Sequence, residues 1–471
     1  MDYKNRLFFL FINIWCYIYK KKLLKTKTNN FDLIFERFLE IYSKDQQPIG
    51  VNFKEMVDSV KFQDRATHSI HIYPAKLLPH IPYFFVNNNF FVKENEYVLD
   101  PFSGSGTVLL EANLAGKNSF GCDANPLARL ISKVKTSTYD TIVLKKLLES
   151  LKIEMQNVIV DENEKYPDVI NIDYWFLPNI KLQLHGILKS LKTISDENYR
   201  DFFLLCFSNC VKKVSLADSR ISVPVKAKLN RETNSLHPFF DESKLKLKNL
   251  ENLDVFEKFT EIVSDNIKRF ENKQKIISKS NDTKIISEDA RNLNLQDESV
   301  DLIISSPPYA GAQKYIRACS LNLGWTELSS KDNLRVLDKK NIGRENYSKS
   351  DYLTLKITGI EEADILLHEI YEINPLRAHI AANYLLEMKQ AIIEASRVLK
   401  RNKHFILIAA NNQVCNREFK TQEYLKQIAE NAGLKTICRL VDDIKSYGLM
   451  TKRNKTASII TCEWVLILKK D

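Results

Sequence analysis

The stretch "EYVLDPFSGSGTVLLEANLAGKNSFGCD", Glu96 to Asp123, decides the fold. Its first five residues are a short apolar run typical of a buried strand, and a glycine-rich turn follows directly. Residues from Thr107 to Leu114 read as a helix, and those from Asn118 to Asp123 as a second strand. This order predicts a βαβ unit whose first turn is rich in glycine.

The remaining sequence continues the alternation of strands and helices, with long interruptions. Further strands are expected at 284–290, 300–306, 404–412, 434–440 and 457–470, and helices at 383–400 and 421–433. The segment at 434–440 is the expected hairpin partner of the terminal strand. Alternating strands and helices predict an α/β fold with a mostly parallel sheet.

The composition is that of a globular protein of one large domain or two to three smaller ones. The chain has 471 residues, of which 44% are hydrophobic and 27% charged, and its net charge is +10. A basic excess fits a polyanionic partner, and it fits a lysine-rich surface equally well. The eight cysteines form no pair of CxxC motifs, so we expect reduced thiols, a cytoplasmic protein and no structural metal.

The N-terminal apolar run, Leu7 to Tyr19, is flanked by basic residues. It is shorter than the about 20 residues that a spanning helix needs, and no small-residue cleavage site follows it. We expect a docked helix or strand. A membrane-surface anchor and a start codon assigned too early are also compatible with this run.

The glycine-rich turn lies between strand and helix, where open α/β sheets bind ligands. Gly104 and Gly106 allow a tight turn and a close approach to a ligand. The turn lacks the Lys-Ser/Thr ending of a phosphate loop, which disfavours ATP. Asp123, at the end of the next strand, is placed to bind ribose hydroxyls or to cap a helix. Asp289 is placed to accept from an exocyclic amine, or again to act as a cap.

The segment "SSPPY" ends the strand that begins near residue 300. Consecutive prolines supply no backbone donors and fix φ, and each forces the preceding residue to be extended. The result is a stiff bracket with outward carbonyls followed by a tyrosine ring, suited to a planar ligand with an amino group. The same residues could also form a proline-rich turn that binds no ligand.

Together these segments resemble the S-adenosylmethionine-dependent DNA amino-methyltransferases, which methylate cytosine N4 or adenine N6. "DPFSGSGT" from Asp100 resembles the family's cofactor loop, "SPPY" from Ser306 its catalytic motif, and "HIYPAKLLPHIP" from His71 the segment that covers the cofactor's methionine end. The matched regions are about 65–130 and 284–471. The resemblance implies a Rossmann-like class I methyltransferase fold with a mostly parallel seven-stranded sheet. Apolar residues at helical spacing between about 140 and 280 predict, in addition, a mainly helical insert.

The resemblance implies a role for each site residue. Asp100 anchors the loop near the methionine, Asp123 binds the ribose and Asp289 binds the adenine. The other residues expected at the cofactor are Tyr73, Pro74, Phe102, Gly104, Ser105, Gly106 and Thr107.

The expected catalytic residues are Ser306, Pro307, Pro308 and Tyr309. Ser306 and the Pro307 carbonyl accept hydrogen bonds from the target amine, and Tyr309 stacks on the flipped base. Serine at the first position favours cytosine N4 over adenine N6. The same motifs would also suit an RNA base methyltransferase or a catalytically silent nucleic-acid-binding subunit. We expect no metal, because His68 and His71 lack partners at a known ligand spacing.

The expected organisation has four parts: an N-terminal helical extension at 1–60, a cofactor-binding half at 61–134, a helical insert at 135–283 and a catalytic half at 284–471. The insert is the preferred target-recognition region, and a second insert at about 315–382 is the other candidate. Within it, 339–349 is either a mobile DNA-facing loop or a solvated surface loop. Double-stranded DNA is the expected partner, with a cognate restriction endonuclease or phage-defence subunit as a further candidate and a membrane role disfavoured.

Overall fold

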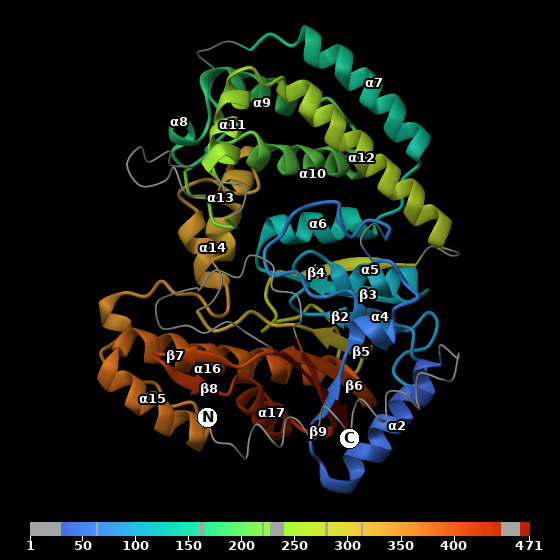
Figure 1. Ribbon diagram of the computed structural model, residues 1–471, viewed down its shortest axis with the longest axis vertical. Helices are drawn as coiled ribbons and strands as arrows, with labels where there is room; N and C mark the ends of the chain where they lie inside the picture. The colour runs from blue at the N-terminus through green and yellow to red at the C-terminus, as the bar shows by residue number, and fades with distance from the viewer. Residues whose placement is uncertain are drawn as a thin grey trace.

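The computed structural model of the protein describes residues 30–62, 65–160, 164–218, 221–226, 240–277, 281–311, 314–443 and 462–471. The apolar run at Leu7–Tyr19 lies outside these residues, so the expected docked helix or strand is not described. Figure 1 shows a sheet flanked by helices in the lower part of the molecule and a group of helices above it.

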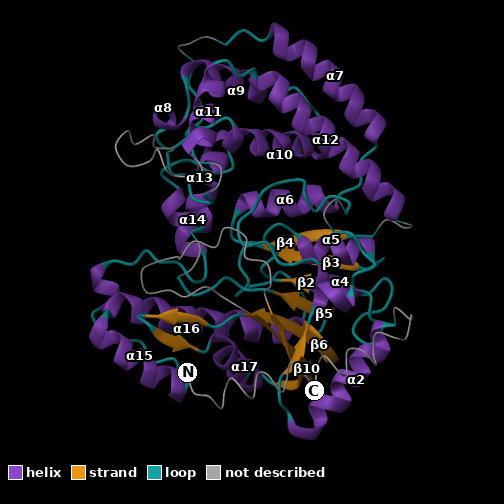
Figure 2. Cartoon of the chain, viewed as in Figure 1, coloured by secondary structure: helices purple, strands orange, loops and turns teal. Residues whose placement is uncertain are grey.

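The centre of the fold is an eight-stranded sheet in the order β1-β9-β10-β6-β5-β2-β3-β4. Neighbouring strands run parallel except at β10, which is antiparallel to both β6 and β9. This confirms the predicted α/β fold, and Figure 2 shows the strands in orange. The strands are β1 (Ile49–Val51), β2 (Tyr97–Asp100), β3 (Asn118–Cys122), β4 (Thr283–Ser287), β5 (Val300–Ser305), β6 (Leu399–Ala409), β9 (Leu434–Asp443) and β10 (Cys462–Lys470).

The sheet has eight strands and not the expected seven. The additional strand is β1, which pairs in parallel with β9 at the edge of the sheet. It lies in the segment 1–60, which was expected to be helical. A strand of three residues is too short to show the alternation by which strands are recognised in a sequence.

Apolar side chains alternate between the two faces of the sheet. Val98 and Leu302 belong to one hydrophobic core, whereas their neighbours Leu99 and Ile303 belong to another. This is the period of two expected for a strand buried on both faces. The first core is completed by α2 (Phe31–Asp45), α3 (Phe53–Met56), α4 (His80–Val86) and α5 (Thr107–Leu114), and the second by α15 (Glu361–Ile373), α16 (Pro375–Val398) and α17 (Thr421–Asn431).

The mainly helical insert is confirmed, and it builds a third core above the sheet (Figure 1). None of the described helices has the length and apolar character that a membrane crossing requires. The helices of this core are α6 (Pro126–Thr136), α7 (Thr141–Asn157), α8 (Ile172–Trp175), α9 (Pro178–Leu191), α10 (Glu197–Lys213), α11 (Phe240–Glu251), α12 (Val255–Ile276) and α13 (Tyr315–Trp325).

The region 315–382 is more regular than the sequence indicated. Besides α13 and α15, it contains α14 (Leu334–Lys340), a 3-10 helix at Lys349–Tyr352 and the start of α16. Most of α13 is buried, and a helix buried on all sides has no amphipathic stripe by which to recognise it. The helix expected from residue 383 begins earlier, at Pro375.

The strand expected at 404–412 is divided between two elements. β6 begins at Leu399 and ends at Ala409, and a separate hairpin of β7 (Asn412–Val414) and β8 (Arg417–Phe419) follows. Its turn places Cys415 and Asn416 at φ 51° and 61°, where asparagine is favoured but cysteine is not. The expected pairing of the chain end with the segment near 434–440 is confirmed by β9 and β10.

His404 of β6 provides a test of how the core depends on pH. Its ring packs against Phe90 and Phe91, with centroids 5.1 and 5.2 Å away. Burial and, to a smaller extent, the charges of Lys469 and Lys403 lower its pKa to about 4. The unfolded chain, with a histidine pKa of about 6.5, therefore binds a proton that the folded chain excludes, so stability is lost as pH falls from about 6.5 towards 4. We expect His404→Phe to lose less thermal stability than the parent between about pH 7 and pH 5. Equal losses in the two proteins would contradict this.

Candidate functional site

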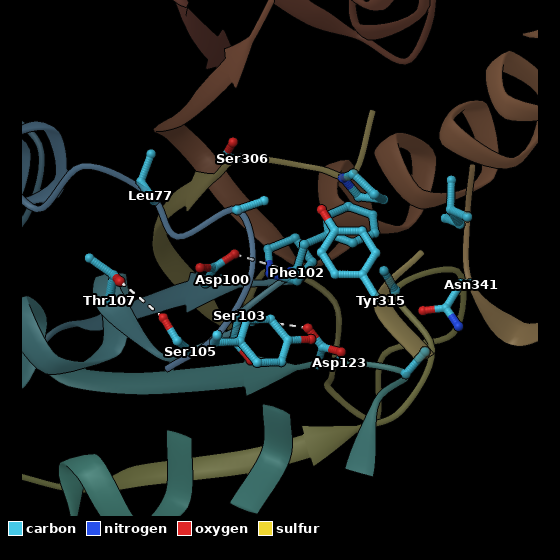
Figure 3. Close-up of a pocket in the computed structure, with 18 of the residues that line it drawn as sticks. Leu77, Asp100, Phe102, Ser103, Ser105, Thr107, Asp123, Ser306, Tyr315 and Asn341 are labelled. Atoms are coloured by element: carbon cyan, nitrogen blue, oxygen red, sulfur yellow. Dashed lines mark hydrogen bonds between the residues drawn. The ribbon is translucent and has the colours of Figure 1, made fainter. Parts of the chain in front are cut away.

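The candidate site is a cavity at the carboxyl ends of β2, β3, β4 and β5. The strand order reverses between β2 and β5, and this switch point is where open α/β sheets bind ligands. Figure 3 shows residues from both halves of the chain around this cavity, with Asp100, Phe102 and Asp123 from one half and Ser306, Tyr315 and Asn341 from the other. The expected residues that line it are Tyr73, Asp100, Phe102, Gly104, Ser105, Thr107, Asp123, Asp289, Ser306 and Pro308.

The cofactor loop depends on two glycines in the left-handed conformation. Gly104 has φ +49° and Gly106 has φ +69°. A Cβ on Gly106 would lie 2.8 Å from Ser132 Oγ and 3.0 Å from its Cα, so this glycine lets α5 begin in contact with α6. Gly106 does not line the cavity itself. The buried Lys135 of α6 donates to the Ser105 carbonyl and fixes the turn from behind.

Asp100 joins the cofactor loop to the catalytic strand. Its Oδ1 accepts from the Phe102 N–H at 3.1 Å and from Ser305 Oγ at 2.8 Å. Burial raises the pKa of Asp100 to about 7, although both hydrogen bonds oppose the shift. Ser305, the last residue of β5, was not predicted as a site residue, because only the four residues after it match the motif.

Asp123 faces the same loop from the end of β3. Its Oδ2 accepts from the Gly104 N–H at 2.8 Å and its Oδ1 from the Asn125 N–H at 2.8 Å. Burial raises its pKa. The alternative that Asp123 caps the next helix is wrong, because Asn125 is the N-cap residue of α6 and accepts from Leu127 N–H at 3.0 Å.

Asp289 is held by Arg291 in a bidentate ion pair. Arg291 Nε lies 2.8 Å from Oδ1, and Arg291 Nη2 lies 2.9 Å from Oδ2. Burial raises the pKa of Asp289, but the contacts with Arg291 outweigh it and hold the pKa below its usual range. The carboxylate is therefore ionised and oriented at the edge of the cavity. Its role toward adenine remains a prediction.

The covering segment contributes Tyr73, whose hydroxyl accepts from Asn125 Nδ2 at 3.2 Å. Its ring is stacked on that of Tyr315, with centroids 6.3 Å apart and planes 22° apart. Pro74 is not among the residues lining the cavity. Tyr315 and Asn341 line it but were not predicted, since both lie in the region expected to be irregular. The one sequence feature that could have indicated Tyr315 is that it is an aromatic residue soon after the SPPY motif.

Only part of the expected catalytic bracket, Ser306–Tyr309, lines the cavity. Ser306 and Pro308 line the cavity, whereas Pro307 and Tyr309 do not. Ser103 adds a buried hydroxyl that has no hydrogen-bond partner among the described residues. An unpaired buried hydroxyl, the carboxyl groups of three aspartates and the flat faces of Phe102 and Tyr73 fit a ligand that carries both hydroxyls and an aromatic ring.

His68 and His71 make contacts other than metal ligation. His68 Nε2 lies 2.5 Å from Glu111 Oε1, and Arg65 Nε lies 3.2 Å from the same oxygen. The sequence missed this carboxylate partner of His68 because it comes from α5. His71 contacts Ser208 Oγ at 3.1 Å. Among the described residues, no group of three or more His, Cys, Asp or Glu side chains is placed to hold a metal ion.

Asp100 generates a pH prediction. At its pKa of about 7 the carboxyl is partly protonated near neutrality, and only the ionised form attracts a cation such as the sulfonium of S-adenosylmethionine. We expect the parental affinity for S-adenosylmethionine to rise as pH increases through about 7, and Asp100→Asn to lack this rise. Titration calorimetry measures both, with S-adenosylhomocysteine, which carries no sulfonium, as the control ligand. The same pH dependence in the variant would show that another group titrates.

The sequence is similar to those of known methyltransferases. Residues 9–133 match the family model described as DNA methylase, N6_N4_Mtase. The Type II methyltransferase M.MvaI of Kocuria varians is 24% identical over 459 residues, which cover 90% of this chain and 97% of that protein. The Type II methyltransferase M.MjaII of Methanocaldococcus jannaschii is 32% identical over 163 residues, 33% of this chain and 29% of that protein.

A further relative from Methanocaldococcus jannaschii is a tRNA (guanine(10)-N2)-dimethyltransferase. It is 34% identical over 124 residues, which cover 24% of this chain and 35% of that protein. The match along nearly the whole chain is thus to a Type II methyltransferase, and the match to a tRNA methyltransferase is confined to a part. Over residues 9–133 the chain is similar to the N6/N4 DNA methylases, and it is a methyltransferase that uses S-adenosylmethionine.

Proposed function

We propose that this protein transfers a methyl group from S-adenosylmethionine to cytosine N4 in double-stranded DNA. The observation that carries the proposal is the position of Ser306, which lines the cavity that the cofactor loop also lines. A serine hydroxyl is a neutral acceptor, suited to orienting an amine and not to removing its proton. Adenine N6 is the alternative target.

The chain's own residues act by alignment. Ser306 Oγ and the Pro307 carbonyl accept the two hydrogens of the target amine, which directs the nitrogen lone pair into the cavity. S-adenosylmethionine supplies a methyl group on a positively charged sulfur, which becomes a neutral thioether when the C–S bond breaks. The new N–CH₃ bond forms as the amine loses a proton to water. Alignment at about 3 Å contributes more to such a transfer than a strong base does.

We place the target nucleotide beside Tyr315. A second cavity adjoins the cofactor cavity, and the two share Tyr315, Asn341 and Ile342. The second cavity is also lined by Lys314, Arg317 and Arg344. Lys314 and Arg344 form ion pairs with Glu345 and Glu387, so Arg317 is the cation suited to a phosphodiester backbone. Tyr309, the last residue of the bracket, is the proposed stacking partner of the flipped base.

The setting we propose is a restriction-modification system in the cytoplasm, with a restriction endonuclease or defence subunit as partner. Its support is that the relatives matched over 90% and 33% of the chain are Type II methyltransferases. Target recognition is assigned to the helical insert at 135–283, with 315–382 contributing. An RNA substrate is the second candidate, favoured only by the partial match to the tRNA enzyme.

The test is methyl transfer from labelled S-adenosylmethionine to unmodified genomic DNA, followed by mass spectrometry of the nucleosides. Transfer RNA and ribosomal RNA are assayed in parallel. We expect N4-methylcytosine from DNA alone. N6-methyladenine would overturn the base assignment, and label only in RNA would overturn the DNA assignment. A matched Tyr309→Ala variant should retain cofactor binding and lose transfer.

Arg317 gives a separate test of DNA contact. It is exposed on α13, and among the described residues its guanidinium forms no ion pair. We expect Arg317→Ala to reduce the slope of log affinity against log salt by about 0.9 while S-adenosylmethionine affinity stays unchanged. Arg401→Ala is the matched control, because Arg401 is 70% exposed near the start of β6, at the opposite edge of the sheet. Equal slopes for the parent and Arg317→Ala would rule out this phosphate contact.

A further inference from the structure

Residues 340–347 connect the cofactor cavity to the catalytic bracket. This segment begins at the last residue of α14, and its first three residues, Lys340, Asn341 and Ile342, line the cavity. Its next residue, Gly343, lies against Tyr309. The segment expected to be either a DNA-facing loop or a solvated surface loop therefore forms a wall of the site, with Ile342 only 6% exposed.

Gly343 makes backbone contacts around Tyr309 that no other residue type permits. Its φ is +79°, and a Cβ built on it would lie 2.7 Å from the Tyr309 carbonyl oxygen and 3.4 Å from the carbonyl carbon. The Gly343 carbonyl accepts from the Gly311 N–H at 3.0 Å. The chain on both sides of residue 310 is thus held against Gly343, and this turn directly follows the SPPY motif.

Ion pairs fix the same segment to α16. Arg344 Nη1 lies 2.6 Å from Glu387 Oε1, and Glu387 is 8% exposed. Arg291 Nη1 approaches the same oxygen at 3.5 Å, and Arg291 also holds Asp289. A continuous chain of charged groups therefore runs from Asp289, at the cofactor cavity, to Arg344.

Further contacts keep the rest of the segment in place. Glu345 Oε1 lies 2.8 Å from Arg377 Nη1, and its Oε2 lies 3.2 Å from Lys314 Nζ, just before α13. The Tyr347 hydroxyl accepts from Asn383 Nδ2 at 2.7 Å. Both Arg377 and Asn383 belong to α16, so the segment is anchored on a rigid helix of the catalytic half.

We propose that residues 340–347 are a positioning element for methyl transfer, in which Gly343 sets the place of Tyr309. Asp289, Arg291, Glu387 and Arg344 hold the element in register with the cofactor cavity. The proposal rests on the proposed base methylation, because it assigns to Tyr309 the stacking of the flipped base. It makes Gly343 necessary for transfer and unnecessary for cofactor binding.

The experiment compares Gly343→Ala with Gly359→Ala. Gly359 has φ +80° and no heavy atom within 4 Å of a built Cβ, so the two substitutions impose similar backbone strain and differ in the clash with Tyr309. We expect Gly343→Ala to lower kcat for DNA methylation by about a hundredfold, with S-adenosylmethionine affinity within about twofold of the parent and Gly359→Ala close to the parent in both. Thermal midpoints measure the strain common to the two variants.

Two results would overturn the proposal. One is a kcat for Gly343→Ala equal to that of Gly359→Ala, and the other is a loss of cofactor affinity as large as the loss of kcat. If Gly343→Ala fails to fold, the proposal is tested with Arg344→Met and Arg344→Lys instead. We expect the methionine variant to have a lower kcat than the parent and the lysine variant to recover part of that kcat. Parental kcat in Arg344→Met would overturn the proposal. A parent that methylates no DNA would instead refute the proposed function.

Discussion

The site depends on one buried carboxylate, Asp100, at the carboxyl end of β2. β2 and β5 are neighbours in register, with Val98 opposite Leu302 and Leu99 opposite Ile303. Their ends therefore meet at the switch point of the sheet, and Asp100 accepts from Phe102 on one side and Ser305 on the other. A single side chain thus links the glycine-rich loop to the strand that precedes SPPY, although Asp100 and Ser305 are 205 positions apart in the sequence.

The covering segment and the helical insert are attached to this centre by buried polar contacts. Glu111 of α5 binds His68 and Arg65, and Asn209 and Asn266 of the insert both donate to the Ile70 carbonyl. Lys273 of α12 donates to three carbonyls at the end of α6, with distances of 3.2, 2.6 and 2.9 Å. Because buried polar groups are costly to leave unpaired, these contacts hold the insert at one position over the cofactor half.

Local sequence patterns were sufficient to predict the parts of the fold that such patterns determine. The βαβ unit from Glu96 to Asp123 was predictable because short apolar runs and a glycine turn occur together in a short stretch. The carboxylates Asp100, Asp123 and Asp289 were predictable because each comes at or just after a strand end, and the ends of parallel strands meet at one edge of the sheet.

The missing parts depend on contacts between distant segments. β1 is defined by its pairing with β9 and not by its own three residues. α13 is buried on nearly all sides, so its sequence shows no helical period. Because this helix was not predicted, its first residue, Tyr315, was not predicted as part of the site. Residues 340–347 resemble a charged surface loop, because their partners on α16 and in Arg291 are remote in sequence. Ser305 was overlooked because its role is a hydrogen bond to the other half of the chain.

The most direct measurement of the central claim is a double-mutant cycle on Asp100 and Ser305. Methyl transfer to DNA is measured for the parent, Asp100→Asn, Ser305→Ala and the double variant. If the hydrogen bond between them links cofactor loop and catalytic strand, the double variant loses little more rate than the worse single variant. If the two losses multiply, the residues act independently, and the site does not depend on this interaction.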